Sequence, residues 1–206
     1  MKVLLINGSP HEKGCTYTAL SLIAGELKAQ GIETEILHVG GQPVGGCIGC
    51  GGCRSGNGCV FGGVVNEAIE KAKTADAFVF GTPVHYASAS GNMTSFMDRL
   101  AYAGGKYLAY KPAAICCSAR RAGTTTTLDQ LVKYPEFFHM PLVSGSYWPM
   151  VHGSNPEQVL QDAEGCAVMQ ELGRNMAWLL RCIEAGKAAG IDHPQNPPRP
   201  MTSFIR

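Results

Sequence analysis

The sequence lacks an apolar run long enough to cross a bilayer, and it lacks an excess of charge of either sign. Its longer apolar stretches, such as Ala77–Phe80 and Pro112–Cys117, are far too short to span a membrane. The 17 Lys and Arg residues are matched by 16 Asp and Glu residues, which leaves a net charge of +1. Proteins that bind nucleic acid need a basic surplus because they neutralise phosphates. We therefore expect neither a membrane nor a nucleic acid among the partners of this chain.

We also expect no secretory signal, because Met1, Lys2 and Val3 lead directly into an apolar strand pattern. The nine cysteines are an odd number, and together with that expectation they predict reduced thiols in the cytoplasm. No break in composition and no internal repeat divides the chain, so we expect one domain over residues 1–206. A segment rich in Gly and Cys at about 40–63 predicts an insert, and the prolines after about 187 predict an irregular tail.

Five apolar segments alternate with helical patterns along the chain. The predicted strands are residues 2–7, 33–39, 76–81, 113–117 and 140–147. The predicted helices start at Thr16 and stop near Gly31, then follow at 64–74, 92–103, 128–134 and, after a cap at Asn155, at 156–185. This alternation predicts an α/β fold in three layers, with a doubly wound, five-stranded parallel sheet and right-handed crossovers. Ligand contacts should then come from loops at the carboxyl ends of strands, here residues 9–18, 82–91 and 118–126.

The first of these loops has the features of a phosphate site. The small residues Gly8, Ser9 and Gly14 lie between a strand and the start of a helix. Free backbone N–H groups and the positive end of the helix dipole converge at such a place, and Ser9, Thr16 and Thr18 add hydroxyl donors. The loop has neither the Gly-Lys-Ser/Thr of a P-loop nor the Gly-x-Gly-x-x-Gly of a dinucleotide site, which favours a terminal phosphate monoester. The alternative is an ordinary strand-to-helix turn with a threonine cap.

The pattern Gly-Ser-Pro followed by Gly-x-Thr-x-Thr resembles the FMN phosphate loop of the flavodoxin-like NADPH-dependent FMN reductase family. The resemblance implies a flavodoxin-like strand order with FMN at the switch point, and a backbone N–H contact from Cys15. A second segment, residues 82–99, resembles that family's Pro-x-Tyr and Met…Asp-Arg stretch, although Thr94 stands where the family has Lys. The residues that the resemblance places against the flavin ring are Pro83, Val84, His85, Tyr86, Ser118, Arg120 and Gly123.

Several of these side chains have more than one interpretation. His85 would contact the ring or donate a proton to reduced flavin, and a role in backbone spacing is the alternative. Arg120 or Arg121 would stabilise the anionic reduced flavin, or bind the phosphate of NADPH with a guanidinium fork. The alternative for both is a pair of solvated surface arginines. Asp98 and Arg99 are expected to pair locally or at a subunit contact.

Four close-spaced cysteines, Cys47, Cys50, Cys53 and Cys59, form the pattern Cys-x2-Cys-x2-Cys-x5-Cys among glycines. Four thiolates suit a [4Fe–4S] cluster or a tetrahedral zinc, and the compact spacing favours the cluster because zinc sites more often use two separated pairs. A loop of metal-free, redox-active thiols is a third interpretation. The spacing is similar to that of the iron–sulfur flavoproteins, a branch of the same family, which implies a cluster next to FMN. An apolar and glycine-rich stretch follows Cys59, where that branch usually has acidic residues.

Together these features predict an FMN-dependent oxidoreductase. It would pass electrons from NAD(P)H, or from a ferredoxin-like donor, through FMN to a quinone or another small acceptor, and a cluster would convert two-electron into one-electron transfer. One alternative is a non-catalytic carrier of the flavodoxin type, but such carriers are generally strongly acidic and this chain is nearly neutral. Another is a thiol or flavin redox sensor. The resemblance and Trp178 on the last helix imply a homodimer or homotetramer.

Overall fold

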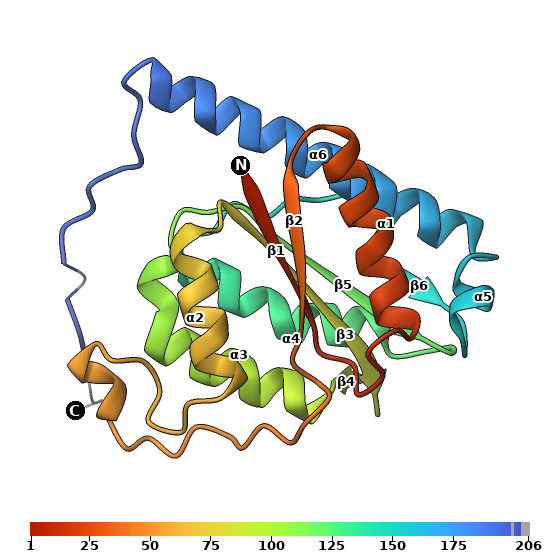
Figure 1. Cartoon of the computed structure of the whole chain (residues 1–206), viewed down its shortest axis with the longest axis horizontal. Helices are drawn as coiled ribbons and strands as arrows, with labels where there is room; N and C mark the ends of the chain where they lie inside the picture. The colour runs from red at the N-terminus through yellow and green to blue at the C-terminus, as the bar shows by residue number, and fades with distance from the viewer. Residues whose placement is uncertain (199, 203–206) are drawn as a thin grey trace.

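The structure is a computed structural model that describes residues 1–198 and 200–202 (Figure 1). Its strands are β1 (Lys2–Asn7), β2 (Glu33–His38), β3 (Ala77–His85), β4 (Ser88–Ala89), β5 (Ala113–Ala119) and β6 (Met150–His152). Its α-helices are α1 (Cys15–Ala29), α2 (Val64–Thr74), α3 (Gly91–Gly104), α4 (Thr124–Phe137), α5 (Pro156–Val159) and α6 (Ala163–Ala188). Two short 3₁₀ helices, η1 (Gly52–Ser55) and η2 (Gly105–Tyr107), lie in the connections.

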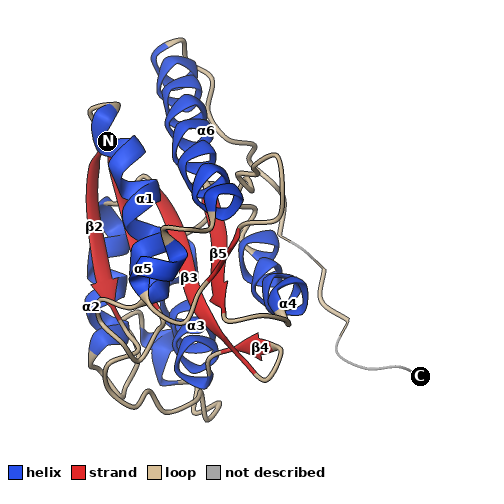
Figure 2. Ribbon diagram, turned by 90° about the vertical axis from the view of Figure 1, so that its right-hand side faces the viewer, coloured by secondary structure: helices blue, strands red, loops and turns tan. Residues whose placement is uncertain are grey.

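The sheet has the strand order β2-β1-β3-β5-β6, and each neighbouring pair along this path is parallel. The short β4 is antiparallel to the end of β3. Helices α1, α5 and α6 cover one face of the sheet, and α2, α3 and α4 cover the other (Figure 1, Figure 2). The predicted doubly wound, flavodoxin-like sheet of five parallel strands is therefore confirmed, and the strand order reverses between β1 and β3.

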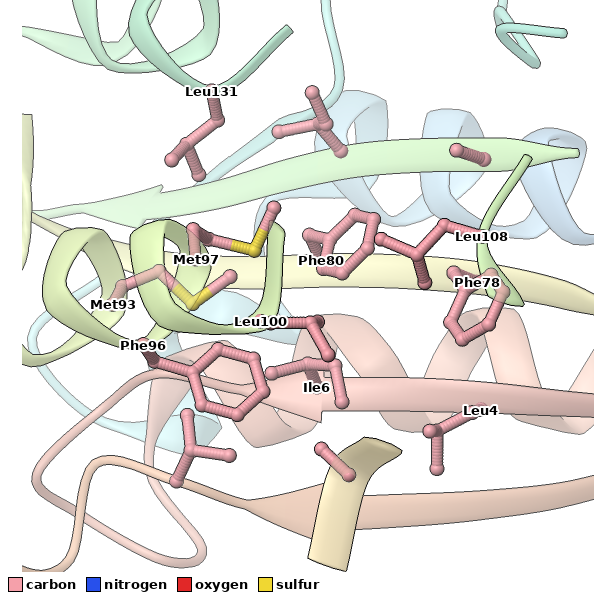
Figure 3. Packing of buried hydrophobic residues seen from close by; sticks show 14 of the residues in the cluster. Leu4, Ile6, Phe78, Phe80, Met93, Phe96, Met97, Leu100, Leu108 and Leu131 are labelled. Carbon is pink, nitrogen blue, oxygen red and sulfur yellow. The ribbon is translucent and has the colours of Figure 1, made fainter. Parts of the chain in front are cut away.

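Burial on both faces explains the continuous apolar sequence of β1. Val3 and Leu5 pack on the side of α1 and α6, whereas Leu4 and Ile6 pack on the side of α2 and α3. Successive side chains of a strand point to opposite faces, so a strand covered on both sides has no position for a polar residue. Figure 3 shows the core on the α3 side, which includes Leu4, Ile6, Phe78, Phe80, Met93, Phe96, Met97, Leu100, Leu108 and Leu131.

The predicted fifth strand at residues 140–147 is wrong, because the fifth parallel strand is β6. Residues 140–147 reach the sheet only through an isolated bridge from Leu142 to β5. This bridge consists of two hydrogen bonds, from the N–H of Ala113 to the carbonyl of Pro141 at 2.9 Å and from the N–H of Val143 to the carbonyl of Ala113 at 2.8 Å. The continuous ladder with β5 forms further along the chain, at Met150–His152. The apolar residues of 140–147 have the pattern of a strand, but such a run does not show which residues pair with a distant strand.

The predicted helix at 156–185 consists of two helices. Asn155 caps the first as expected, since its Oδ1 accepts the N–H of Gln158 at 2.9 Å, but α5 ends after one turn. Asp162 then caps α6 by accepting the N–H of Gly165 at 3.0 Å. A second N-cap inside the predicted segment therefore starts a new helix.

Two of the predicted ligand loops begin later than expected. The ladder between β3 and β5 continues through the pairs Thr82–Cys117 and Pro83–Ser118, so both strands extend further toward the carboxyl edge. The helix predicted at 128–134 is longer and begins at Thr124. These longer strands and this longer helix shorten the two loops to a few residues each.

The predicted irregular tail begins after α6, and residues 191–198 and 200–202 have no regular structure. The rest of that prediction, residues 199 and 203–206, lies outside the described residues. In the described part of the chain, no helix combines the length and the apolar character that crossing a membrane requires.

Candidate functional site

The loop between β1 and α1 ends in a helix N-terminus with unpaired donors. Gly14 occupies the N-cap position and supplies no side-chain cap. Within residues 1–198 and 200–202, the backbone N–H groups of Cys15, Thr16 and Tyr17 have no hydrogen-bond partner. The first turn of α1 contains no acidic side chain that would repel an anion. Three unpaired N–H groups at the positive end of a helix fit a phosphate group.

Hydrogen bonds hold this loop in place. Asn7 accepts the N–H of Ser9 at 3.1 Å and donates to the carbonyl of Glu12 at 2.9 Å. The Ser9 hydroxyl accepts the N–H of His11 at 3.1 Å, which leaves its own proton free to donate. Nε2 of His38 lies 2.7 Å from the carbonyl oxygen of Ser9. The loop is therefore built before any ligand binds, and Ser9 keeps a donor for that ligand.

The side chains of the other predicted phosphate contacts have partners inside the protein. Thr16 is 1% exposed, and its hydroxyl oxygen lies 2.8 Å from that of Ser118. The Thr18 hydroxyl donates to a carbonyl one turn back, at 3.2 Å. The Cys15 thiol donates to the carbonyl of Gly153 at 3.5 Å, and burial raises the pKa of this thiol. Thr16 and Cys15 can thus reach an anion through their backbone N–H groups. A phosphate contact from the hydroxyl of Thr16 or Thr18 stays a prediction.

A tight hairpin forms the second loop. His85 at the end of β3 pairs with Ser88 at the start of β4, which leaves Tyr86 and Ala87 as the turn. These two residues have φ angles of 51° and 58°, in the left-handed region that non-glycine residues rarely adopt. The Tyr86 side chain is fully exposed. A strained turn that presents an aromatic ring at the carboxyl edge of the sheet fits a planar ligand that stacks on it.

The third loop, between β5 and α4, packs against this hairpin. Gly123 is the N-cap of α4 with φ of 94°, and a Cβ atom there would lie 2.7 Å from Cα of Ala87. The Thr126 hydroxyl donates to the carbonyl of Ala87 at 2.8 Å. Arg120 and Arg121 directly precede this contact and are exposed. The second and third loops therefore form one continuous surface.

Ser90 connects that surface to the phosphate loop. Its hydroxyl donates to the carbonyl of Gly8 at 2.8 Å, and its N–H donates to the Thr82 hydroxyl at 3.1 Å. We call the joined phosphate loop, hairpin and β5–α4 loop the rim. The sequence-predicted residues that lie at this edge of the sheet are Ser9, Cys15, Thr16, Thr18, Pro83, Val84, His85, Tyr86, Ser118, Arg120 and Gly123.

The four predicted metal ligands lie in the long connection between β2 and α2, which we call the insert (residues 39–63). Six of its glycines have positive φ angles between 58° and 84°, so the backbone turns repeatedly in conformations that other residues avoid. Cys47, Cys50, Cys53 and Cys59 line one cavity, together with Arg99 of α3. All nine cysteines are free thiols.

Four thiols around one cavity fit an iron–sulfur cluster in number and in chemistry. Among the residues that the structure describes, no group of three or more His, Cys, Asp or Glu side chains is placed to hold a single metal ion. Four cysteines can bind either a [4Fe–4S] cluster or a tetrahedral zinc, so the identity of the bound group stays a prediction.

The predicted local pair between Asp98 and Arg99 is wrong. Asp98 accepts a hydrogen bond from the Tyr134 hydroxyl at 2.5 Å. Arg99 instead donates from Nε to Sγ of Cys59 at 3.2 Å. Consecutive residues of a helix point in different directions, so neighbours in sequence do not face each other. The spacing in the sequence could have indicated that Arg99 points into the protein. It lies three residues after the buried Phe96 and therefore on the same face of α3.

Two asparagines that the sequence analysis did not single out hold the insert. Asn66 accepts the N–H of Cys59 at 2.8 Å and donates to its carbonyl at 3.0 Å. Asn92 donates to the carbonyl of Gly40 at 3.1 Å and accepts the N–H of Val44 at 3.1 Å. They lie in the first turns of α2 and α3, so these helices hold the two ends of the insert. A single polar residue with a distant partner leaves no pattern in a sequence.

Known proteins resemble this chain over most of its length. A sequence model of the NADPH-dependent FMN reductase family matches residues 1–155, which include the whole rim and the insert. An iron–sulfur flavoprotein of Archaeoglobus fulgidus is 31% identical over 196 residues, 91% of this chain and 96% of that protein. An iron–sulfur flavoprotein of Methanocaldococcus jannaschii is 28% identical over 193 residues, 89% of this chain and 100% of that protein.

Solved structures share the fold at lower sequence identity. RosB with a bound 8-demethyl-8-formylriboflavin-5′-phosphate intermediate superposes with a TM-score of 0.70 at 15% identity, covering 100% of this chain and 94% of RosB. A flavodoxin from the domain Archaea superposes with a TM-score of 0.60 at 13% identity, covering 88% of this chain and 99% of the flavodoxin. These likenesses show the flavodoxin-like fold. The family match and the full-length relatives confirm the predicted family, and this chain belongs to the NADPH-dependent FMN reductase family of flavoproteins, alongside its iron–sulfur flavoproteins.

Proposed function

We propose that this protein is an NAD(P)H-dependent FMN oxidoreductase that delivers electrons to a quinone or another small acceptor, and that its insert holds a [4Fe–4S] cluster. The observation that carries the proposal is the rim. It joins three unpaired N–H donors, at Cys15, Thr16 and Tyr17, to the exposed aromatic ring of Tyr86. An anion site and an aromatic surface on one sheet edge are the two things that a flavin mononucleotide requires.

Different residues of the rim would bind the phosphate and the ring system of FMN. The N–H groups at the start of α1 and the Ser9 hydroxyl would bind the phosphate. Pro83 to Tyr86 and Ser118 to Gly123 would lie against the ring system. Bound FMN supplies hydride acceptance and stepwise electron release, which no amino-acid side chain provides. The chain itself has to fix the phosphate, orient the ring and leave it accessible to the substrates.

Exposed polar groups on the rim suit a nucleotide substrate. Arg120 and Arg121 are both exposed, and a guanidinium donates two parallel hydrogen bonds to a phosphate. One of them beside the flavin would also favour its negatively charged reduced form. His85 is exposed at the end of β3, where it would contact the ring or provide a proton. We assign no catalytic base, since hydride transfer requires none.

The insert is connected to the rim through the start of α3. Ser90 caps this helix and binds the phosphate loop, while Asn92 binds the insert at Gly40 and Val44. A cluster in the insert would therefore lie on the same support as the flavin site, where a ferredoxin-like donor could supply electrons one at a time. The exposed Trp148 and Trp178 favour a partner subunit, and we propose a cytoplasmic homodimer or homotetramer.

Anaerobic purification, followed by absorption spectroscopy and NAD(P)H oxidation with a quinone, tests this function. We expect flavin bands, a broad absorption that extends into the red, and steady oxidation that depends on the acceptor. Flavin bands without the broad absorption would retain the oxidoreductase and remove the cluster, and metal analysis would then distinguish zinc from metal-free thiols. Failure of the apoprotein to bind added FMN would overturn the proposal.

Two rival functions predict different results in the same assays. A flavodoxin-type carrier would bind FMN but would not oxidise NAD(P)H steadily. A redox sensor would show reversible thiol oxidation without turnover. The matched variants Cys53→Ala and Cys182→Ala separate a cluster ligand from an ordinary exposed thiol on α6. The first should lose iron and keep FMN, and the second should keep both.

A further inference from the structure

Arg99 is a buried cation without a carboxylate partner. The residue is 7% exposed, on the face of α3 that also carries Phe96 and Leu100. No ion pair joins it to an Asp or Glu in residues 1–198 and 200–202, and its neighbour Asp98 is bound to Tyr134. Arginine is almost never buried without a compensating partner, because removing its charge from water is costly.

All three nitrogens of the guanidinium instead donate to the insert. Nε donates to Sγ of Cys59 at 3.2 Å, Nη1 donates to the carbonyl of Gly45 at 3.3 Å, and Nη2 donates to the carbonyl of Gly62 at 3.1 Å. The ring of Phe61 lies beside the same guanidinium, with its centroid 5.4 Å from Cζ. Arg99 therefore joins residues before and after the four cysteines, and it touches one of the predicted ligands directly.

The sulfur of Cys59 accepts a hydrogen bond from Arg99 where a buried arginine would usually have a carboxylate partner. Arg99 lines the same cavity as Cys47, Cys50, Cys53 and Cys59. Four thiolates on an iron–sulfur core carry a net negative charge, and this charge increases when the cluster is reduced. The guanidinium is buried and Cys59 is half-buried, so water screens the interaction of these two groups less than it would at the surface, whereas Cys47 and Cys50 are exposed. The charge of Arg99 should therefore stabilise the reduced cluster more than the oxidised cluster.

We propose that Arg99 is the internal counter-ion of the cluster: its buried guanidinium positions Cys59 and raises the reduction potential of the [4Fe–4S] centre. This inference rests on the cluster of the proposed function. Net charge and hydrogen bonds to the sulfurs are known determinants of cluster potentials, and Arg99 supplies both at one ligand. It is a positioning residue, since it acts through Cys59 and the field in the cavity.

Two other residues of the region allow the charge to be tested separately. Asn66 holds the backbone of Cys59 through two hydrogen bonds but has no charge. Arg54 has the same charge as Arg99 and follows Cys53 in the chain, but its side chain is exposed. Water and salt screen an exposed charge, so the loss of Arg54 should have little effect on the cluster.

The test is a redox titration of the reconstituted holoprotein, followed by the EPR signal of the reduced cluster, for wild type, R99Q, R99K and R54Q. We expect R99Q to lower the one-electron equilibrium constant about tenfold, a shift of about 59 mV toward negative potential. R99K keeps the charge and should shift the potential less than R99Q. R54Q should change the constant by less than about twofold. FMN affinity should be the same in all four proteins.

The outcomes separate this inference from the proposed function. Wild type that takes up no iron would overturn both the cluster and the counter-ion. Wild type with a cluster, but with the same potential in R99Q, would overturn the counter-ion alone. An R54Q shift as large as that of R99Q would also overturn it, because any nearby positive charge would then suffice. If R99Q takes up no iron, the R99K variant provides the test. We expect R99K to take up iron and to have a potential close to that of wild type. An R99K protein without iron, or with a clearly lower potential, would contradict the inference.

Discussion

The hydroxyl oxygens of Thr16 and Ser118 lie 2.8 Å apart in the interior of the protein. Thr16 belongs to the first turn of α1, directly after the phosphate loop. Ser118 belongs to β5, directly before the loop that contains Arg120 and Gly123. Both were predicted to contact the ligand, yet each is the partner of the other. This hydrogen bond connects the two ends of the rim and holds the start of α1 against the sheet.

Replacing Thr16 by Val should therefore lower the stability of the fold more than it weakens FMN binding. The valine leaves the buried Ser118 hydroxyl without a partner, which costs about 1–3 kcal/mol of unfolding free energy. The N–H of residue 16 is unchanged, so the anion site keeps this donor. Urea denaturation of the apoprotein and FMN titration measure the two effects.

Two further variants serve as controls: Ser118→Ala alone, and the double variant that combines Thr16→Val with Ser118→Ala. Ser118→Ala alone should also destabilise the protein, because it removes the partner of Thr16. The double variant should lose less unfolding free energy than the sum of the single losses, since no unpaired hydroxyl remains. Strictly additive losses would show that the two hydroxyls do not stabilise each other.

The parts of the fold that the sequence predicted well are those with local causes. Val3 to Ile6 are buried on both faces, so the strand appears as an unbroken apolar run. The turn at Gly8 and Gly14 follows immediately, and helix α1 begins within one residue of its predicted start. Alternation of such segments was enough to predict a doubly wound sheet, because few topologies join them with short crossovers.

The parts that the sequence did not predict depend on distant partners. Arg99 was expected to pair with Asp98 locally or at a subunit contact, but its contacts in the structure are Cys59, Gly45 and Gly62. His38 supports the phosphate loop from the end of β2. The fifth parallel strand was misplaced because an apolar run does not show which residues pair with a distant strand. Each of these features is set by tertiary geometry rather than by a local pattern.

Gly123→Ala should disturb the rim. Residue 123 has φ of 94°, and the added Cβ would lie 2.7 Å from Cα of Ala87, so the hairpin and the β5–α4 loop would have to separate. The strain should cost about 1–3 kcal/mol of unfolding free energy and weaken FMN binding. Thermal unfolding and FMN titration measure both effects.

Gly25→Ala is the control for this substitution. Gly25 is exposed in the middle of α1, and a Cβ there would meet nothing within 4 Å. Alanine is the better helix former, so this variant should gain about 0.5–1 kcal/mol and bind FMN like wild type. If Gly123→Ala also left stability and FMN affinity unchanged, the close packing of the two loops would have no functional importance.

Glu35 should make the stability of the protein depend on pH in the acidic range. Its carboxylate lies 2.8 Å from Nζ of Lys2 and also pairs with Lys71, and the hydrogen bond from Lys2 is the main cause of its lowered pKa. A lowered pKa in the folded state stabilises the protein above the pKa of the unfolded chain, near 4.3. This contribution is lost as the pH falls through the lower pKa of the folded state.

Glu35→Gln should therefore be less stable than wild type at pH 7, by no more than about 1 kcal/mol because the group is partly exposed and screened by salt. The difference should shrink at high salt and disappear at acidic pH. Glu184→Gln is the control, since Glu184 is exposed on α6 and has no ion pair within the described part of the chain. Urea denaturation between acidic and neutral pH measures the effect. A difference that persists at the acidic end would contradict the electrostatic explanation.

Tyr86→Gly and Ala87→Gly form a matched pair on the hairpin, because both residues have positive φ angles. Glycine relieves the backbone strain at either position but increases the entropy of the unfolded chain, so the unfolding free energy should change by less than about 1 kcal/mol in both variants. The two differ in the side chain, since only Tyr86 presents an exposed aromatic ring. Losing a stacking contact should weaken FMN binding about tenfold in Tyr86→Gly.

Fluorescence titration with FMN distinguishes the ring from the turn. Ala87→Gly and Tyr86→Phe should both bind FMN like wild type, because the first keeps the tyrosine and the second keeps the aromatic face. Equal weakening in both glycine variants would assign the effect to the flexibility of the turn. Equal affinity in all three variants would show that the ring does not contact the flavin. The strained φ of Tyr86 would then need another explanation, because a non-glycine residue keeps such a conformation only where its surroundings impose it.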